Sequence, residues 1–207
     1  MKSDECILFS GGAPGAESAF GACAERHGVE EVNFTFDGHK IERGRGVRVL
    51  NHEELRAGDV SLEYVSRLMR RRFTDAPTIR KVLQTLWYQV NHGQEIYVIG
   101  TILEDGMVRG GTGWGAEFAK LCNKPLNVFD QAKDGWFTWA DGEWRAYEGG
   151  AGPVITPALH GHRHAHVEGQ RHQGDRRPVR AVVRFLTRRG AGQRRGRRRV
   201  ALRTWSW

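Results

Sequence analysis

Two glycine-rich phrases constrain the fold of this chain more than any other feature of its sequence. Residues 7–17 read ILFSGGAPGAE, and residues 106–117 read GMVRGGTGWGAE. Each phrase lies between an apolar run and a run whose apolar residues have helical spacing, and each ends in Gly-Ala-Glu. Because glycine permits positive φ angles and a close approach of the backbone, each phrase is typical of a tight turn from a strand into a helix.

A turn of this kind suits a bound phosphate. The helix after the turn presents free N–H groups and the positive end of its dipole, and both attract anions. The two phrases together predict a nucleotide-derived small molecule as the ligand. The alternative is a tight connection without a ligand, in which side-chain hydroxyls only cap the backbone. The predicted phosphate-binding residues are Ser10, Gly11, Gly12, Gly15, Arg109, Gly110, Gly111, Thr112 and Gly113.

Two charged residues at the second phrase have alternative interpretations. Arg109 precedes the glycines, where its guanidinium pairs with a phosphate in bidentate fashion or simply faces solvent. Glu117 falls in the first turn of a helix predicted over residues 114–121. It complements the helix dipole there or acts as a general acid or base on a bound ligand. No spacing of Cys, His, Asp or Glu indicates a metal site, and no cofactor is predicted.

The rest of the first 150 residues alternates strand and helix patterns. Asn51 and Glu54 form a capping-box pattern for a short helix. Residues 136–147 read as a β-hairpin with its turn at Asp141-Gly142. The apolar stripe Ile79, Val82, Leu83, Leu86 and Val90 is expected to be buried. Strands are predicted over residues 6–9, 32–36, 95–100 and 125–129, and helices over 16–27, 60–72, 77–91 and 114–121.

This alternation predicts an α/β fold with three layers, in which a largely parallel sheet carries helices on both faces. In such sheets ligands bind at the carboxyl ends of the strands, where both glycine turns lie. The sequence leaves open whether the two turns are neighbours. Residues 1–150 are therefore interpreted as one nucleotide-binding domain, and residues 151–207 as a separate tail.

Composition indicates a cytoplasmic protein. The three cysteines, Cys6, Cys23 and Cys122, are interpreted as free thiols of the core in a reducing compartment. The first residues are polar and do not resemble a signal peptide. No apolar run approaches the ~20 residues that a membrane-spanning helix needs, so no membrane partner is predicted.

The net charge of +8 comes entirely from the tail. Residues 1–150 carry 18 lysines and arginines against 22 acidic residues, whereas residues 151–207 carry 14 arginines, no lysine and two acidic residues. Basic runs such as residues 194–199 bind nucleic-acid phosphates in many proteins. A solvated, disordered tail is the alternative.

A third interpretation of the tail is a shifted reading frame. Fourteen arginines without a lysine are typical of GC-rich DNA read out of frame. Codons for residues 159–186 can be chosen so that a one-base shift encodes a Gly-Thr-rich turn, an amphipathic helix and then a stop. Under this hypothesis the tail has no function, and nucleic acid is a partner only if the tail is native.

The second phrase resembles a known enzyme signature. Residues 110–117 (GGTGWGAE) resemble the Gly-Gly-x-Gly-Thr-x-x-Glu signature of the Lonely Guy phosphoribohydrolases, also known as lysine-decarboxylase-like proteins. Trp114 stands in place of the threonine, and Arg109 in place of the usual preceding proline. Residues 10–16 (SGGAPGA) resemble the first loop of the wider superfamily that includes the DNA-processing protein A Rossmann domain.

The resemblance spans roughly residues 6–130 and implies a Rossmann-like fold with a nucleotide or nucleotide-derived ligand. In the phosphoribohydrolases the signature glutamate and an arginine from another segment cleave an N-glycosidic bond. Glu117 would be that glutamate here. By helix position alone, the candidates for the arginine are Arg70, Arg71, Arg72 and Arg80.

Three functional hypotheses follow. The first is a nucleotide sensor or carrier that binds phosphate at both glycine turns. The second is a hydrolase that cleaves a nucleoside monophosphate with Glu117. The third is nucleic-acid binding through the basic tail. A homodimer is expected by analogy with related folds only.

Overall fold

The computed structural model describes residues 6–148, 152–153, 165–170 and 200–205, the last two segments by their backbone alone. The helices are α1 (Ala16–Arg26), α2 (His52–Arg56), α3 (Asp59–Leu68), α4 (Pro77–His92) and α5 (Thr112–Leu121). The strands are β1 (Ile7–Ser10), β2 (Glu30–Thr35), β3 (Val47–Val49), β4 (Ile96–Gly100), β5 (Leu126–Asp130), β6 (Gly135–Ala140), β7 (Glu143–Ala146), β8 (Ala165–Gln170) and β9 (Val200–Trp205).

The strands form a three-strand parallel unit and a mixed four-strand unit. Strand β2 pairs in parallel with both β1 and β3. Strand β4 pairs in parallel with β5, while β5–β6 and β6–β7 are antiparallel. The backbones of β8 and β9 lie between the two units, in the order β3-β2-β1-β9-β8-β4-β5-β6-β7. The predicted α/β class and the hairpin of β6 and β7 are confirmed.

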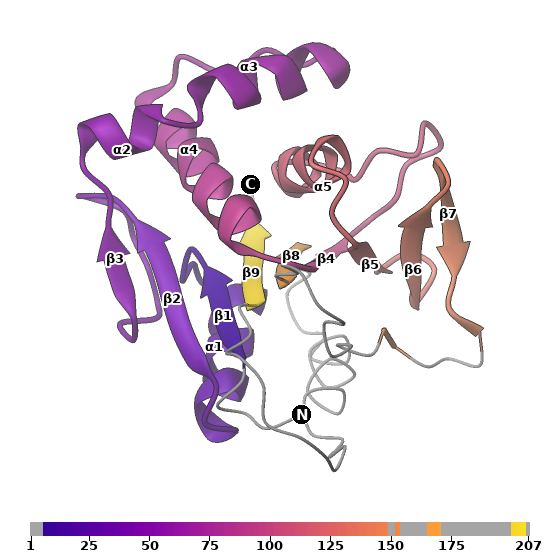
Figure 1. Cartoon of the computed structure of the whole chain (residues 1–207), viewed down its shortest axis with the longest axis horizontal. Coiled ribbons are helices and arrows are strands. Elements are labelled where there is room, and N and C mark those ends of the chain that lie inside the picture. The colour runs from indigo at the N-terminus through magenta and orange to yellow at the C-terminus, as the bar shows by residue number, and fades with distance from the viewer. Residues whose placement is uncertain (1–5, 149–151, 154–164, 171–199, 206–207) are drawn as a thin grey trace.

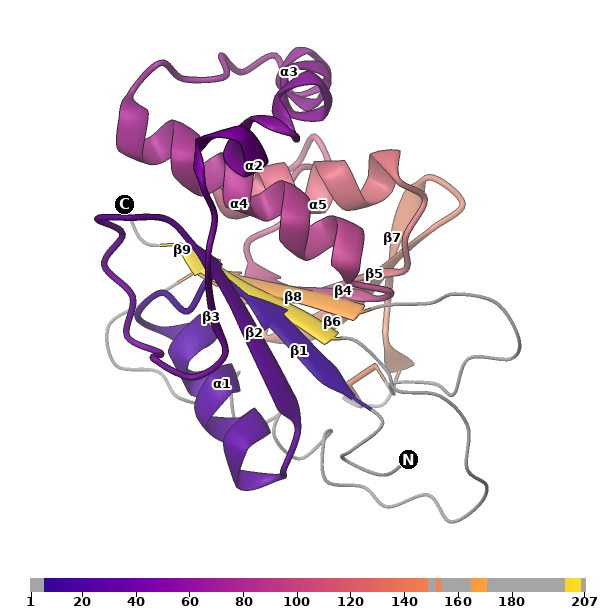
Figure 2. The same cartoon turned by 60° about the vertical axis from the view of Figure 1, so that its left-hand side comes forward.

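Helices flank the strands on two sides. Figure 1 shows α2, α3, α4 and α5 together above the strands, and Figure 2 shows α1 on the opposite face. The first glycine turn therefore leads from β1 into a helix on one face. The second leads from β4 into α5 on the other face.

The buried core lies between these helices and the strands. On the α1 face, Phe20 and Cys23 are fully buried, as their helical spacing predicted. On the other face, Leu83, Leu86 and Val90 of the α4 stripe pack with residues of α5 and β4, whereas Val82 packs with residues of β1 and β2. Four of the five stripe residues are buried, whereas Ile79 is only partly covered. Cys6 and Cys23 are buried, and Cys122 is partly exposed.

The helix predicted over residues 60–72 ends early. Helix α3 stops at Leu68, and Arg70 adopts a φ of +52°. The Arg70 N–H donates to Arg67 O at 3.1 Å, and the Arg71 N–H donates to Ser66 O at 2.9 Å. These two bonds are those of a Schellman motif, which ends a helix through one left-handed residue. Arg71 and Arg72 therefore lie in a loop instead of on a helix end.

Other local predictions are confirmed or refined. Asn51 caps α2 by accepting from the Glu54 N–H at 2.9 Å, and Glu54 accepts from the Asn51 N–H at 2.8 Å. The short edge strand β3 was not predicted, because its three residues are exposed and carry no burial pattern. Within the described part of the chain, no helix combines the length and apolar character that crossing a bilayer requires.

Candidate functional site

The first glycine turn has the backbone shape that its sequence predicted. Gly12 and Gly15 adopt φ angles of +70° and +105°, which residues with a side chain rarely reach. A Cβ atom at Gly12 would also come within 3.2 Å of the Asn33 side chain. The turn is therefore tight, and it delivers the chain from β1 directly into α1.

Side chains of the same segment occupy the N–H groups of this turn. The Gly12 N–H donates to Ser10 Oγ at 3.1 Å, and the Ala13 N–H donates to Glu17 Oε2 at 2.5 Å. Both acceptor residues are buried, with Glu17 only 1% exposed. A carboxylate of the protein thus lies where an anionic ligand would accept hydrogen bonds.

A polar loop covers the turn from the outside. The N–H groups of Glu42 and Arg43 donate to Gly12 O at 2.8 and 3.1 Å. The Arg43 guanidinium in turn binds the buried carboxylate of Glu31 through two hydrogen bonds, at 3.1 and 2.8 Å. The hydrogen bonds to Glu31 and Glu25 raise the pKa of Arg43, although burial opposes them. This loop therefore covers the first turn at Gly12, whereas Pro14 at the tip of the turn is exposed.

The second glycine turn brings the start of α5 very close to the backbone of the connection that precedes it. Gly110 adopts a φ of +77°, and the Arg109 N–H donates to Thr101 O at 2.9 Å. A Cβ atom at Gly113 would lie 2.1 Å from Val108 O, so only glycine fits there. Thr112 begins the helix, and its hydroxyl is buried without a hydrogen-bond partner.

Arg71 joins this turn from the loop after α3. Its Nη1 atom donates to Gly110 O at 3.0 Å, which fixes the guanidinium beside the glycines. The sequence offered Arg71 only as one of four candidate arginines. The sequence did not indicate that Arg71 lies in a loop, because the helix ends at Arg70 without the glycine that usually marks such an end.

A pocket of about 300 Å³ opens between this loop, α4 and the second turn. We call it the second-turn pocket. Its polar wall contains the arginines and the turn glycines, and its apolar wall contains side chains of α4 and α5. The lining residues are Arg71, Arg72, Thr74, Ile79, Val82, Leu83, Gly110, Gly111 and Trp114.

Glu117 and Arg109 lie outside the lining of this pocket. Because α5 begins at Thr112, Glu117 falls in its second turn and not in the first as predicted. Its Oε1 atom accepts from Lys120 Nζ at 2.7 Å. Lys120 Nζ also lies 3.8 Å from the ring centre of Trp139 on β6. The carboxylate therefore contributes to the contact between α5 and the hairpin. Arg109 is exposed.

The two glycine turns have different neighbours. In the sheet order the strands that precede them, β1 and β4, are separated by β9 and β8. Gly12 contacts the loop at Glu42 and Arg43, whereas Gly110 contacts Arg71.

Asp130 ends β5, the strand next to β4, where its Oδ1 atom accepts from the Ala132 N–H at 2.9 Å.

Two further sequence predictions concern metal ions and the tail. No cluster of three His, Cys, Asp or Glu side chains that could hold a metal ion is present among the residues that the structure describes. The basic run at residues 194–199, on which nucleic-acid binding depends, lies outside the described residues. The hypotheses of a disordered or frame-shifted tail concern mainly residues outside the described segments.

Comparison with known proteins adds no relative: no family model, curated protein or solved structure matches this chain.

Proposed function

We propose that this protein binds a phosphate-bearing, nucleotide-derived small molecule in the second-turn pocket, as a sensor or carrier. One observation supports this proposal above all: Arg71 and Arg72 share a pocket with the backbone of Gly110 and Gly111 at the start of α5. A ten-residue helix begins there, and its N-terminus carries the positive end of the helix dipole. Two cationic side chains next to a helix N-terminus suit a phosphate.

The shape of the pocket suits the rest of such a ligand. The guanidinium of Arg71 uses one donor on Gly110 O, and a guanidinium has five N–H donors in all. The opposite wall is apolar and includes Trp114, which is 6% exposed, and Val82. A ribose or base can pack against this wall while the arginines bind the phosphate. The volume of about 300 Å³ is at the lower end of small-molecule sites.

The arrangement of strands and helices is compatible with a Rossmann-like, three-layer fold, which we propose for this domain. Helices α1 and α5 lie on opposite faces of the sheet (Figure 2). In open α/β sheets, ligands bind outside the carboxyl ends of the strands. Gly110 and Gly111, which line the second-turn pocket, belong to the connection that follows the carboxyl end of β4.

The proposal assigns the phosphate to the second turn alone. At the first turn, the carboxylate of Glu17 already accepts from the Ala13 N–H. A phosphate placed there would meet a buried like charge, which strongly disfavours binding. The first turn is then a structural connection, and the Glu17 carboxylate stabilises its backbone in place of a bound anion.

We propose binding at this pocket without hydrolysis of the ligand. The residue that the resemblance assigns to catalysis, Glu117, contacts Lys120 and does not line the pocket. A general acid or base must reach the proton that it transfers, directly or through one water. The described contacts give Glu117 no such position.

Two measurements on the full chain test the proposal. Mass spectrometry of small molecules released by denaturing the purified protein should detect a nucleotide. Isothermal titration with AMP and with ADP-ribose should give saturable binding, which Arg71→Ala weakens about 10- to 100-fold, because a hydrogen bond to a charged group contributes ~1.5–3 kcal/mol.

The matched control is Arg48→Ala, which removes an exposed arginine that contacts Glu54 on α2. It should leave the affinity unchanged. Gly111→Asp, which places a negative charge at the start of α5, should abolish binding. An empty protein that binds neither probe, or equal affinities for the wild type and Arg71→Ala, would contradict the proposal.

A further inference from the structure

Helix α3 presents an apolar stripe to solvent. Val60, Tyr64 and Leu68 are 85%, 53% and 52% exposed, and they are spaced four residues apart on one side of the helix. The described part of the chain exposes six large hydrophobic residues, and three of them belong to this helix. Because exposed apolar patches are characteristic of interaction sites, this stripe requires an explanation.

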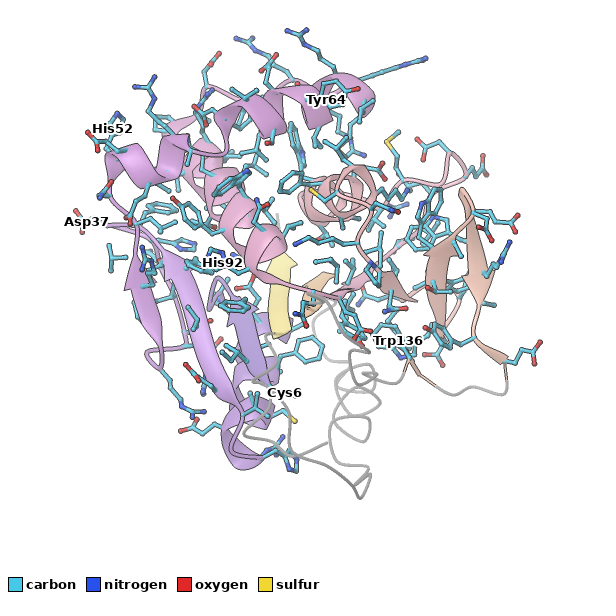
Figure 3. All side chains as sticks on the ribbon, in the orientation of Figure 1. Cys6, Asp37, His52, Tyr64, His92 and Trp136 are labelled. Carbon is cyan, nitrogen blue, oxygen red and sulfur yellow. The ribbon has the colours of Figure 1, made fainter. Side chains whose placement is uncertain are left out.

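The opposite side of the same helix is firmly anchored. Leu62 and Val65 are fully buried in the core with α4 and α5. Arg80 on α4 also binds Asp59 at the start of α3, at 2.9 Å. The exposed stripe therefore does not result from a loosely attached helix. Figure 3 shows Tyr64 at the outer side of the helical layer, away from the strands.

A pocket of about 450 Å³ adjoins the stripe. Its floor includes Phe73, whose ring lies 4.1 Å from the guanidinium carbon of Arg80. Its rim contains Glu63 and Arg67 of α3, and these two side chains form an exposed ion pair at 3.6 Å. An exposed pair of this kind contributes little to the stability of one chain, so both charges are available to a partner.

We propose that this surface is the interface between two copies of this chain, with α3 antiparallel to α3 of the second copy. The stripe reads the same in both directions about Tyr64: an apolar residue lies four positions before it and another four positions after it. An antiparallel pair therefore places Val60 opposite Leu68 of the second copy, and the two Tyr64 rings beside each other.

The charges of the stripe fit the same arrangement. Glu63 and Arg67 each precede a stripe residue by one position, so they lie along one flank of the helix. In a two-fold antiparallel pair, this flank of one helix lies beside the same flank of the other helix, and the two chains run in opposite directions. Glu63 of each copy then faces Arg67 of the other, and unlike charges meet at both ends. This self-complementary charge pattern favours a second copy over an unrelated partner.

The interface is expected to be weak to moderate in strength. A ten-residue helix is only about 15 Å long, and stable interfaces bury about 800 Å² per partner. Two α3 helices bury an area of this order only if their side chains interlock and also fill the pocket beside each stripe. We therefore expect a dissociation constant in the micromolar range.

Sedimentation velocity of the full chain tests this dimer over concentrations from about 1 to about 100 µM, the range in which weak complexes form. The wild type should change from monomer to dimer within the series. Tyr64→Glu should raise the dissociation constant at least about tenfold, because central aromatic residues dominate interfaces. The control Val49→Glu alters a valine that is 59% exposed on β3, and it should leave the dimer intact.

A charge exchange distinguishes this two-fold pairing from other modes of association. Glu63→Arg alone and Arg67→Glu alone should each weaken the dimer, because like charges then meet on both copies. The double variant should restore it. A wild type that stays monomeric throughout the series, association that Tyr64→Glu leaves unchanged, or a double variant as weak as the single ones would each overturn the proposal. Circular dichroism verifies that every variant is folded.

Discussion

The buried carboxylate of Glu17 is the residue that most changes the interpretation of the first glycine turn. Replacing it with alanine should destabilise the protein by about 1–3 kcal/mol, because the partly buried Ala13 N–H loses its acceptor. It should also create a place for a free anion. Inorganic phosphate should then raise the melting temperature of Glu17→Ala more than that of the wild type.

Thermal unfolding with and without inorganic phosphate checks this prediction. Glu53→Ala is the control, since Glu53 is an exposed carboxylate in the first turn of α2. It should change neither the melting temperature nor the effect of phosphate by much. Equal stabilisation of all three proteins by phosphate would argue against an internal anion.

At the scale of single residues, the sequence predicted where glycine was needed but not what fills the site. The positive φ angles at Gly12, Gly15 and Gly110 follow from the residue type and its position after a strand. The occupation of the first turn by Glu17, and the approach of Arg71 to Gly110, depend on side-chain directions. Such directions follow from tertiary packing, which no local pattern reports.

At the scale of elements, three helices end by the same device with three different residues. Gly28 after α1, Arg70 after α3 and Asn123 after α5 all adopt positive φ. In each case the N–H of that residue and the next N–H bond back to the last helical turn. The sequence predicted the end of α1 correctly to within one residue, because the glycine at position 28 is typical of this motif. It missed the end of α3, where arginine takes the same conformation.

Arg70 holds its left-handed conformation at an energetic cost. A left-handed conformation costs a residue with a side chain about 1 kcal/mol relative to glycine. Arg70→Gly should therefore raise the free energy of unfolding by about 0.5–1 kcal/mol in urea denaturation. Asn123→Gly is the matched comparison and should give a smaller gain, because asparagine tolerates this conformation better. A clear loss of stability in Arg70→Gly would contradict this account of the helix end.

At the scale of the whole molecule, groups with shifted pKa values limit stability at both ends of the pH range: two are buried, whereas Glu25 is exposed. Burial raises the pKa of Tyr97 well above its ordinary value, and it also raises the pKa of the Cys23 thiol. The Arg43 guanidinium lowers the pKa of Glu25. Because Tyr97 and Cys23 lose their protons less readily in the folded chain, their contribution to the free energy of unfolding is fully present at lower pH and is lost as pH rises. The lowered pKa of Glu25 works in the opposite sense, so its contribution is lost in acid.

Tyr97 allows a direct test of the alkaline limb. The free energy of unfolding of the wild type should fall as pH rises above the ordinary tyrosine pKa, since only the unfolded chain releases that proton readily. In Tyr97→Phe this fall should be shallower, although the variant loses the bond to Glu95. Urea denaturation across an alkaline pH series measures both slopes. Parallel slopes in the two proteins would exclude Tyr97 as a cause.

The fold class was readable from the sequence, whereas the arrangement of the strands was not. Alternating strand and helix patterns predicted an α/β protein, and the Asp141-Gly142 turn predicted the hairpin, because both signals are local. The separation of β1 from β4 in the sheet order depends on pairing between distant segments. The exposed edge strand β3 escaped prediction for a related reason, since it has no buried face.

The contact between Gly113 and Val108 O has a consequence for reading sequence variation. Any side chain at position 113 collides with that carbonyl oxygen, whether or not a ligand is bound. Selection for packing alone therefore keeps glycine there, and its persistence among descendants of this sequence would say nothing about phosphate. Core packing does not constrain position 71 in this way, because the Arg71 guanidinium lines a pocket and does not fill the core. If the proposed ligand is bound, variation at position 71 should reflect changes in that ligand more directly than variation at position 113.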